Sequence, residues 1–164
     1  MKHKKLICLL LSLIFCFAMV PMTAMAAEAP EGVWTDYAAD SFESGTGTQT
    51  DPYVIATAEQ LAKLAVDVNS GVDSVSHSGE YFVLSENIDL SAHRWRPIGD
   101  GATDRSFHAF LGHFDGQNHT ITGLYVDESI ETEKDGLSYN AGLFGNLYDA
   151  VKIHVTVADL GDHR

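Results

Sequence analysis

A short sequence pattern occurs twice in this chain, and it limits the possible folds more than any other feature. Phe110-Leu111-Gly112-His113-Phe114 precedes a strand-like run over 120–126, and Leu143-Phe144-Gly145-Asn146-Leu147 precedes another over 151–157. Aligning the copies pairs Gly112 with Gly145 and Ile121 with Ile153. Units of roughly 20 to 45 residues that stack on their neighbours form solenoids. Because the runs are short strands separated by Gly and Asn turns, the repeat favours a β-solenoid over a helical one.

One segment has a helical pattern instead. Leu61, Leu64, Ala65 and Val68 follow the i, i+3, i+4, i+7 spacing of a single helix face. Thr57 and Gln60 form a capping box before it, and Asn69-Ser70-Gly71 supplies a stop. The spacing predicts a helix over 58–69. Runs rich in aromatic and β-branched residues predict strands over 53–55, 81–84 and 88–90.

The N-terminus has the features of an export signal. Lys2-His3-Lys4-Lys5 is a positive segment, residues 6–20 are apolar, and Ala24-Met25-Ala26 is a small-x-small cleavage site. We therefore expect a signal peptide over 1–26 with cleavage before Ala27, in a bacterial product that is secreted or displayed at the cell surface. The alternative, an uncleaved anchor, is disfavoured because the apolar stretch is shorter than the roughly 20 residues of a spanning helix.

Composition excludes several functions. The chain has 10 Lys+Arg against 23 Asp+Glu and a formal net charge of −13. Three of the basic residues lie in the predicted signal, so the remainder is more acidic still. Such a surface repels phosphate backbones and anionic lipid, which excludes nucleic acid and membrane insertion after signal cleavage. Both cysteines, Cys8 and Cys16, lie in the signal, so neither disulfides nor thiolate metal sites are expected beyond it.

A series of motifs after residue 44 resembles one protein family. The series runs through Gly45-Thr46-Gly47-Thr48, Asp51-Pro52-Tyr53-Val54-Ile55, Thr57-Ala58-Glu59-Gln60-Leu61, Tyr81-Phe82-Val83-Leu84, Ile88-Asp89-Leu90, Trp95-Arg96-Pro97-Ile98-Gly99, Phe114-Asp115-Gly116-Gln117-Asn118-His119-Thr120-Ile121 and Ala141-Gly142-Leu143-Phe144-Gly145. In order and spacing it resembles bacterial surface proteins that carry the GLUG motif.

The resemblance implies a fold and a role. It implies a mainly β chain, the N-terminal portion of a right-handed parallel β-helix (a pectin-lyase-like solenoid) with one capping helix near 58–69. Such modules occur in adhesin-like secreted proteins and in non-catalytic regions of IgA-specific metallopeptidases. Gln117-Asn118 stands where the family has an Asn-Gly turn, and the chain carries one motif where relatives carry many. We expect a flexible segment over 27–44 and a β-helix module over 45–164 that is incomplete at its C-terminal end.

Two constellations could hold a metal. The first combines four histidines with three acids, and an imidazole is a common metal ligand. None of the histidine pairs has the i, i+4 spacing of a helical site, so turn and loop histidines are the favoured interpretation. The second is acidic, over 100–104 and 127–135, and lacks the spacing of a calcium loop. The first set is His93, His108, His113 and His119 with Asp100, Asp104 and Asp115.

Catalytic motifs are missing from the sequence. It contains no His-Glu-x-x-His, Gly-x-Ser-x-Gly or P-loop pattern. Asp89, Arg94, Arg96 and Asp115 could be assembled into a polysaccharide-cleaving site, but nothing distinguishes these acids from the others. Several motif residues are assigned to the fold rather than to chemistry, with glycines at tight corners and aromatics filling the interior. They are Trp95, Pro97, Gly99, Phe114, Gly116, Gly142, Phe144 and Gly145.

We therefore expect a secreted or cell-surface, non-catalytic β-helical module with an adhesion, binding or structural role. No catalytic residue, cofactor or metal is assigned. The expected partner is an extracellular glycan or a host or surface protein, and self-association through the C-terminal coil is a further expectation. The alternatives are part of a polysaccharide lyase or glycoside hydrolase, or the scaffold of a secreted peptidase.

Overall fold

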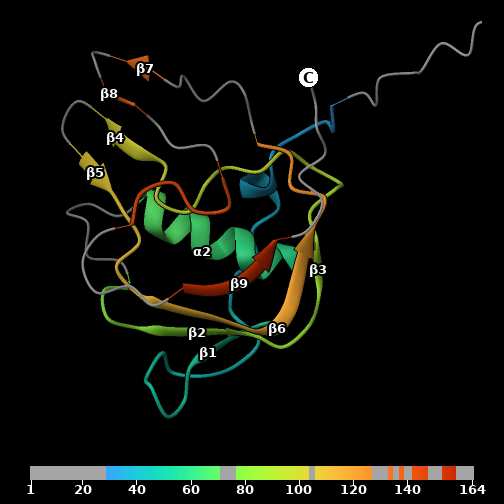
Figure 1. Ribbon diagram of the computed structural model, residues 1–164, viewed down its shortest axis with the longest axis vertical. Helices are drawn as coiled ribbons and strands as arrows, with labels where there is room; N and C mark the ends of the chain where they lie inside the picture. Colours follow the sequence, from blue (N-terminus) through green and yellow to red (C-terminus); the bar gives the residue numbers. More distant parts are fainter. Residues whose placement is uncertain are drawn as a thin grey trace, which may run out of the picture.

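A computed structural model describes residues 29–70, 77–103, 106–126, 133–134, 137–138, 142–147 and 153–157. The predicted signal peptide, Asp104 and the last seven residues lie outside this part of the chain. Most of the acidic segment 127–135 lies outside it as well. The described residues are mainly β, with a parallel sheet and one α-helix (Figure 1).

The helix α2 spans Ala58–Ser70, one residue beyond the predicted end. Its capping differs slightly from the ideal box. The Gln60 backbone N–H donates to Thr57 Oγ1 at 3.3 Å, but the Gln60 side chain accepts from the N–H of Ala56 at 2.8 Å. The apolar face predicted from the spacing is buried, with Leu61, Leu64 and Ala65 fully inaccessible to solvent. Burial of this face fixes α2 against the strands.

Five of the described strands form the parallel sheet. They are β1 (Tyr53–Ile55), β2 (Tyr81–Leu84), β3 (Ile88–Asp89), β6 (His113–Thr122) and β9 (Ile153–Val157). β1 pairs with β2, β2 with β6, and β6 with β9, so each strand lies beside the next along this series (Figure 1). The register places Tyr53 beside Phe82, Phe82 beside Phe114, and Phe114 beside Ile153. The predicted strand over 88–90 is shorter by one residue, and the one predicted over 120–126 begins earlier and ends at Thr122.

The long strand β6 bends in its middle. Gln117 and Asn118 have φ values of 50° and 65°, in the left-handed region where Asn is among the better-tolerated side chains. The turn expected at this dipeptide is therefore a bend inside a strand. Before it β6 pairs with β2, and after it Ile121 pairs with Ile88 of β3. β9 pairs with β6 on both sides of this bend, and the register of the pairing shifts at the bend.

Isolated parallel bridges join a further series of residues away from the sheet. Val33 pairs with Arg94, Trp95 with Val126, Ile98 with Phe144, and Phe110 with Leu147. The third bridge corrects the predicted repeat alignment. Gly145 lies against Gly99 and not Gly112, because the Leu-Phe-Gly segment stacks on Pro97-Ile98-Gly99. Ile153 likewise pairs with Phe114 rather than with Ile121.

The interior is filled by large apolar side chains from every level of the sheet. Trp95 is completely buried, and its Nε1 donates to the Leu143 carbonyl at 3.0 Å. Gly116 is also a packing residue, since a Cβ there would lie 2.9 Å from the His154 carbonyl oxygen. The largest fully buried side chains are Trp95, Phe82, Phe110, Phe114, Ile55, Leu61, Leu64, Leu84, Leu90, Ile98, Ile121 and Pro97.

The expectation of a flexible segment over 27–44 needs correction for its described part. Trp34 begins a 3-10 helix, η1 (Trp34–Tyr37), is 5% exposed, and donates from Nε1 to the Leu90 carbonyl at 2.9 Å. Phe42 packs against Tyr53 and Phe82. Aromatic side chains bury much apolar area, so this segment adds to the core.

Two antiparallel hairpins complete the described structure. The first joins β4 (Gly101–Thr103) to β5 (Ser106–His108), and the second joins β7 (Glu133–Lys134) to β8 (Leu137–Ser138). Both project beyond the parallel sheet at the upper left of Figure 1. Their backbone pairing is separate from the sheet.

Candidate functional site

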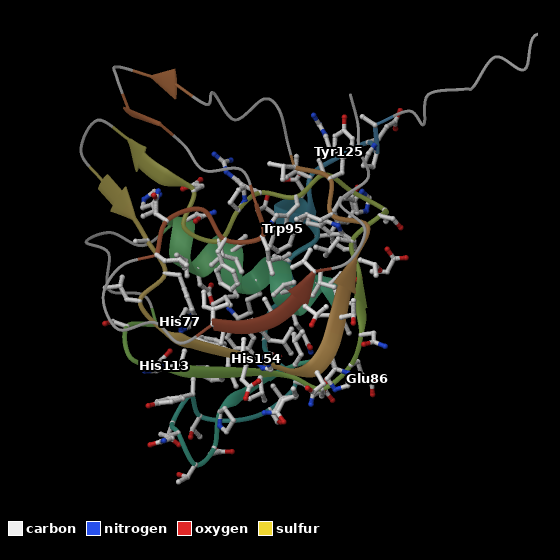
Figure 2. All side chains as sticks on the ribbon, viewed as in Figure 1. His77, Glu86, Trp95, His113, Tyr125 and His154 are labelled. Carbon is white, nitrogen blue, oxygen red and sulfur yellow. The ribbon has the colours of Figure 1, made fainter. Side chains whose placement is uncertain are left out.

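A groove of about 420 Å³ crosses the outward face of the parallel sheet. Its wall residues come from four consecutive levels: the turn before β1, then β2, β6 and β9. Figure 2 shows His113 and His154 on this side of the sheet, with Trp95 on the other. The groove is lined by Gln49, Pro52, Tyr81, Phe82, Val83, His113, Phe114, Asp115, Gln117 and His154.

Strand alternation determines which side chains face the groove. In β2, Phe82 and Leu84 are buried, while Tyr81 and Val83 are half-exposed on the opposite face. The parallel register then sets Tyr81 beside His113 and Val83 beside Asp115. The rings of Tyr81 and His113 stack with centroids 4.3 Å apart and planes 21° apart. Outward residues of successive strands thus form rows that run across the sheet.

Asp115 is the only carboxylate among the described residues that line the groove. Gln117 holds it in place: its backbone N–H donates to Oδ1 at 3.0 Å, and its Nε2 donates to Oδ2 at 2.9 Å. His154 Nδ1 lies 3.5 Å from Oδ1, beyond the range of a well-formed hydrogen bond. The His154 and Asp115 side chains are 69% and 48% exposed. Both therefore remain accessible to a ligand.

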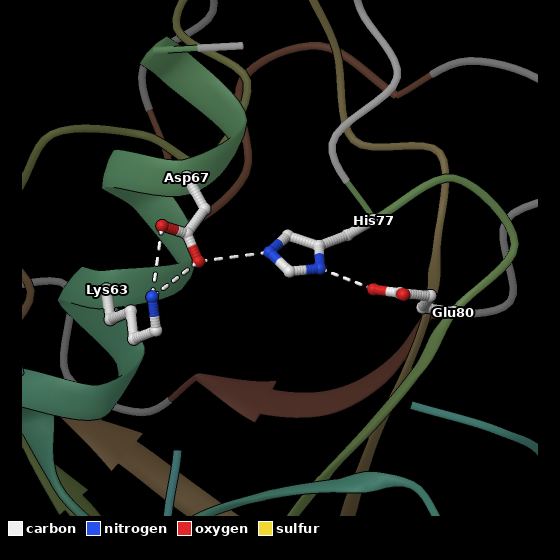
Figure 3. A network of polar contacts seen from close by, with 4 residues as sticks. All are labelled: Lys63, Asp67, His77 and Glu80. Atoms are coloured by element: carbon white, nitrogen blue, oxygen red, sulfur yellow. Dashed lines mark hydrogen bonds and ion pairs between the residues drawn. The ribbon is translucent and has the colours of Figure 1, made fainter. Parts of the chain in front are cut away.

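A second polar cluster joins α2 to the start of β2. Asp67 accepts from Lys63 Nζ at 2.9 Å and contacts His77 Nε2 at 3.0 Å, while His77 Nδ1 contacts Glu80 (Figure 3). His77 also lies among the rings of Phe42, Tyr53 and Phe82. Its side chain is 16% exposed, and it borders a shallow cavity of about 320 Å³.

The ion pairs of this cluster shift two pKa values. Burial opposes the charged form of His77, but the hydrogen bonds to Asp67 and Glu80 outweigh it, so the pKa of His77 is raised. Burial likewise disfavours the Asp67 carboxylate, yet hydrogen bonds from His77 and Lys63 leave its pKa below the ordinary value. The charged forms of both side chains are therefore favoured. The cluster links the helix to the sheet.

The four histidines of the predicted metal constellation do not gather at one place. His93 stacks on Tyr37 with centroids 3.9 Å apart, and His108 Nδ1 contacts Asp100 Oδ1 at 2.9 Å. His113 lies in the groove, and His119 is half-buried just after the bend in β6. Within the described part of the chain, no group of three or more His, Cys, Asp or Glu side chains could hold a metal ion.

The acids and arginines of the hypothetical cleavage site also have separate surroundings. Asp89 accepts from the Ser91 backbone N–H at 2.9 Å, and this bond lowers its pKa. Arg94 Nε donates to the Gly32 carbonyl at 3.3 Å, and Arg96 Nε donates to Asp100 at 2.8 Å. Asp115 lies in β6 before its bend, whereas Asp89 of β3 pairs with Thr122 after the bend.

Comparison with known proteins finds a relative that matches part of this chain. A protein of Evansella cellulosilytica named "Putative Gly-rich membrane protein" is 36% identical over 110 residues. The match covers 63% of this chain and only 10% of that protein, so the chain spans a small part of the relative's length. No protein-family model matches the chain, and no solved structure matches it.

In the described part of the structure, no helix is both long and apolar enough to cross a membrane.

Only part of the groove was predictable from the sequence. His113 and Asp115 are candidates there, but as members of a metal or catalytic set. Tyr81, Gln49 and His154 lie far apart along the chain and have no predicted role. The one available signal was the alternation over 151–157, which places His154 on the polar face of its strand. Only the strand register brings these residues together.

Proposed function

We propose that this chain is an exported, non-catalytic module, a right-handed parallel β-helix that binds an extracellular polymer through its outward groove. The single observation that carries this proposal is that one groove takes residues from the turn before β1 and from the successive strands β2, β6 and β9. A surface repeated at each level suits an extended ligand, which can contact every level in turn.

Strand pairing supports the β-helical architecture. Successive levels pair in parallel at Tyr53, Phe82, Phe114 and Ile153, and separate parallel bridges join Trp95 to Val126 and Ile98 to Phe144. A coil that stacks on the next coil has parallel neighbours on more than one of its sides. The intervals along the chain fall in the range of roughly 20 to 50 residues that is typical of repeat proteins. The helix α2 would cover the first coil.

Export to the cell envelope agrees with two independent facts. The first 26 residues have the composition of a cleavable signal. The Evansella protein, of which this chain matches a small part, is named as a membrane protein. A binding module that forms part of a longer envelope protein fits both, and its role would be adhesion or attachment to a surface polymer.

A binding array combined with a turnover assay tests this function. The protein, purified after export, is applied to arrays of glycans and extracellular matrix proteins. Its release of reducing sugar from pectins and host glycans is measured in parallel. We expect retention on a polymer without release of reducing sugar, and loss of retention in a Tyr81→Ala/Gln117→Ala variant. Glu86→Ala, at an exposed position outside the groove, is the matched control. Sugar release that depends on Asp115 would show an enzyme instead.

A further inference from the structure

The chemistry of the groove identifies a class of ligand, and this inference rests on the proposed binding function. We propose that the groove binds an uncharged, hydroxyl-rich glycan that lies across the strands. The groove offers amide, phenol, imidazole and carboxylate groups from Gln49, Tyr81, His113, Asp115, Gln117 and His154. These groups together supply both donors and acceptors, which is what a row of sugar hydroxyls requires.

The charge distribution disfavours an acidic glycan. No lysine or arginine is among the described residues that line the groove, so no permanent cation is there to pair with a uronate or a sulfate. The chain as a whole carries a formal charge of −13. A field of this sign repels anionic polymers before contact. Acidic polysaccharides are therefore poor ligands.

The state of Asp115 disfavours a ligand that depends on cationic groups. Both carboxylate oxygens already accept hydrogen bonds from Gln117, and His154 lies 3.5 Å from one of them. A carboxylate that is held in this way acts as a fixed acceptor for a hydroxyl, because its charge is already partly compensated. The Asp115 carboxylate is therefore better suited to accept a hydrogen bond from a neutral hydroxyl than to pair with a cation.

The pairing of the strands disfavours a peptide that binds by strand addition. Within the groove floor, β2 pairs with β1 on one side and with β6 on the other, and β6 pairs with β2 and β9. Their backbone donors and acceptors are therefore used within the sheet, and strand addition requires a free edge. Recognition over β2 and β6 must therefore come from side chains. Neighbouring strands are about 4.8 Å apart, so the four levels span about 14 Å, enough for a short run of sugar units.

Calorimetry with four hexasaccharides of different charge tests the inference. The exported protein is titrated with hexamers of glucose, N-acetylglucosamine, galacturonic acid and glucosamine. We expect binding by at least one of the two uncharged hexamers, at least about tenfold tighter than by either charged one. The affinity should change less than about twofold between 50 and 500 mM NaCl, because screening acts on charge–charge attraction. Gln117→Ala and Tyr81→Ala should each weaken binding by roughly tenfold, the scale of a lost ligand hydrogen bond.

Each other outcome overturns the inference in a recognisable way. Tighter binding by the galacturonate or glucosamine hexamer, with affinity that falls steeply as salt rises, would show a charge-driven groove and would leave the binding function intact. Failure of all four hexamers, together with retention on a matrix protein that requires Tyr81, would show a protein ligand at the same groove. Binding that is equal in Tyr81→Ala and Glu86→Ala would place the ligand elsewhere, and would contradict both the inference and the proposed site.

Discussion

The backbone of Gly145 rests directly on the backbone of Gly99. The Asn146 N–H donates to the Gly99 carbonyl at 2.7 Å, and the Gly145 N–H donates to the Ile98 carbonyl at 2.9 Å. A Cβ on Gly145 would lie only 2.3 Å from the Gly99 carbonyl oxygen. This contact explains why the Leu-Phe-Gly segment contains a glycine, because any side chain would push the two levels apart.

Substitution of Gly145 by alanine should therefore destabilise the protein. Because the obstructing atom is a backbone oxygen, the two levels must separate, and we expect a loss of about 2 to 3 kcal/mol in the free energy of unfolding. Urea denaturation of the purified variant measures it. Gly79→Ala is the control, since a Cβ there meets nothing within 4 Å and only its φ of +73° opposes the change. Its cost should be smaller, about 1 kcal/mol. Equal losses in the two variants would contradict the close contact.

The helix α2 should be essential for the fold. Leu64 is completely buried in the core, and Leu64→Asp would place an unpaired carboxylate there. A cost of several kcal/mol follows, on the order of the total stability of a small domain. We expect insoluble or unfolded protein by circular dichroism and light scattering. Glu59→Gln, on the exposed side of the same helix, should melt like the wild type. A soluble Leu64→Asp protein with an unchanged melting temperature would show that α2 does not support the core.

Asn69 should stabilise the protein by connecting the end of α2 to the segment 97–100. Its Oδ1 accepts from the N–H groups of Gly99 and Asp100, and its Nδ2 donates to the Pro97 carbonyl at 2.9 Å. Asn69→Ala removes three hydrogen bonds and should cost about 2 to 3 kcal/mol. Asn69→Asp keeps the acceptor and should lose less. Thermal melting of the two variants gives the order of their stabilities, and an alanine variant more stable than the aspartate variant would contradict this prediction.

The cluster of Lys63, Asp67, His77 and Glu80 should make stability depend on pH. The pKa of His77 is raised from 6.5, so its stabilisation is fully present below pH 6.5 and is lost as the pH rises through the folded-state pKa. The pKa of Asp67 is lowered from 3.8, so its contribution is present above pH 3.8 and is lost as the pH falls through the folded-state value. The cluster therefore stabilises most between these limits.

Melting temperatures from pH 3 to 9 check this dependence. His77→Asn should flatten the decline above pH 6.5, and Asn tolerates the left-handed backbone of this position, where φ is 64°. His154→Asn, at an exposed position, serves as the control. If His77→Asn and the wild type lose stability in parallel above pH 6.5, the cluster is not the cause.

Local features were predictable from the sequence, whereas the pairing of distant segments was not. Thr57, Gln60 and the apolar spacing at Leu61 and Leu64 act within a few residues, so they located α2 to within one residue. The partner of Gly145 depends on how much chain lies between levels. That length varies, because a long acidic segment separates Val126 from Gly142. Matching the two Gly-containing segments by their residues therefore selected Gly112 instead of Gly99.

The residues that line the groove were harder still to predict, because they come together only when the right strands pair. Asp115 and His113 are close in sequence and were considered together, but His154 comes from the next level of the sheet. Tyr81 comes from the level before, and its alternation with buried Phe82 gives only the face on which it lies. Which residues share a row follows from register, and no local pattern encodes register when loops differ in length.

Backbone nuclear Overhauser contacts in the exported protein, labelled with ¹⁵N and ¹³C, test the central claim most directly. Stacked parallel levels require contacts that join Tyr53 to Phe82, Phe82 to Phe114, and Phe114 to Ile153. They also require contacts between Ile98 and Phe144. Observation of this series would support the coil-upon-coil account and the groove that depends on it. Contacts that join Ile121 to Ile153, or an antiparallel pattern between β6 and β9, would contradict it.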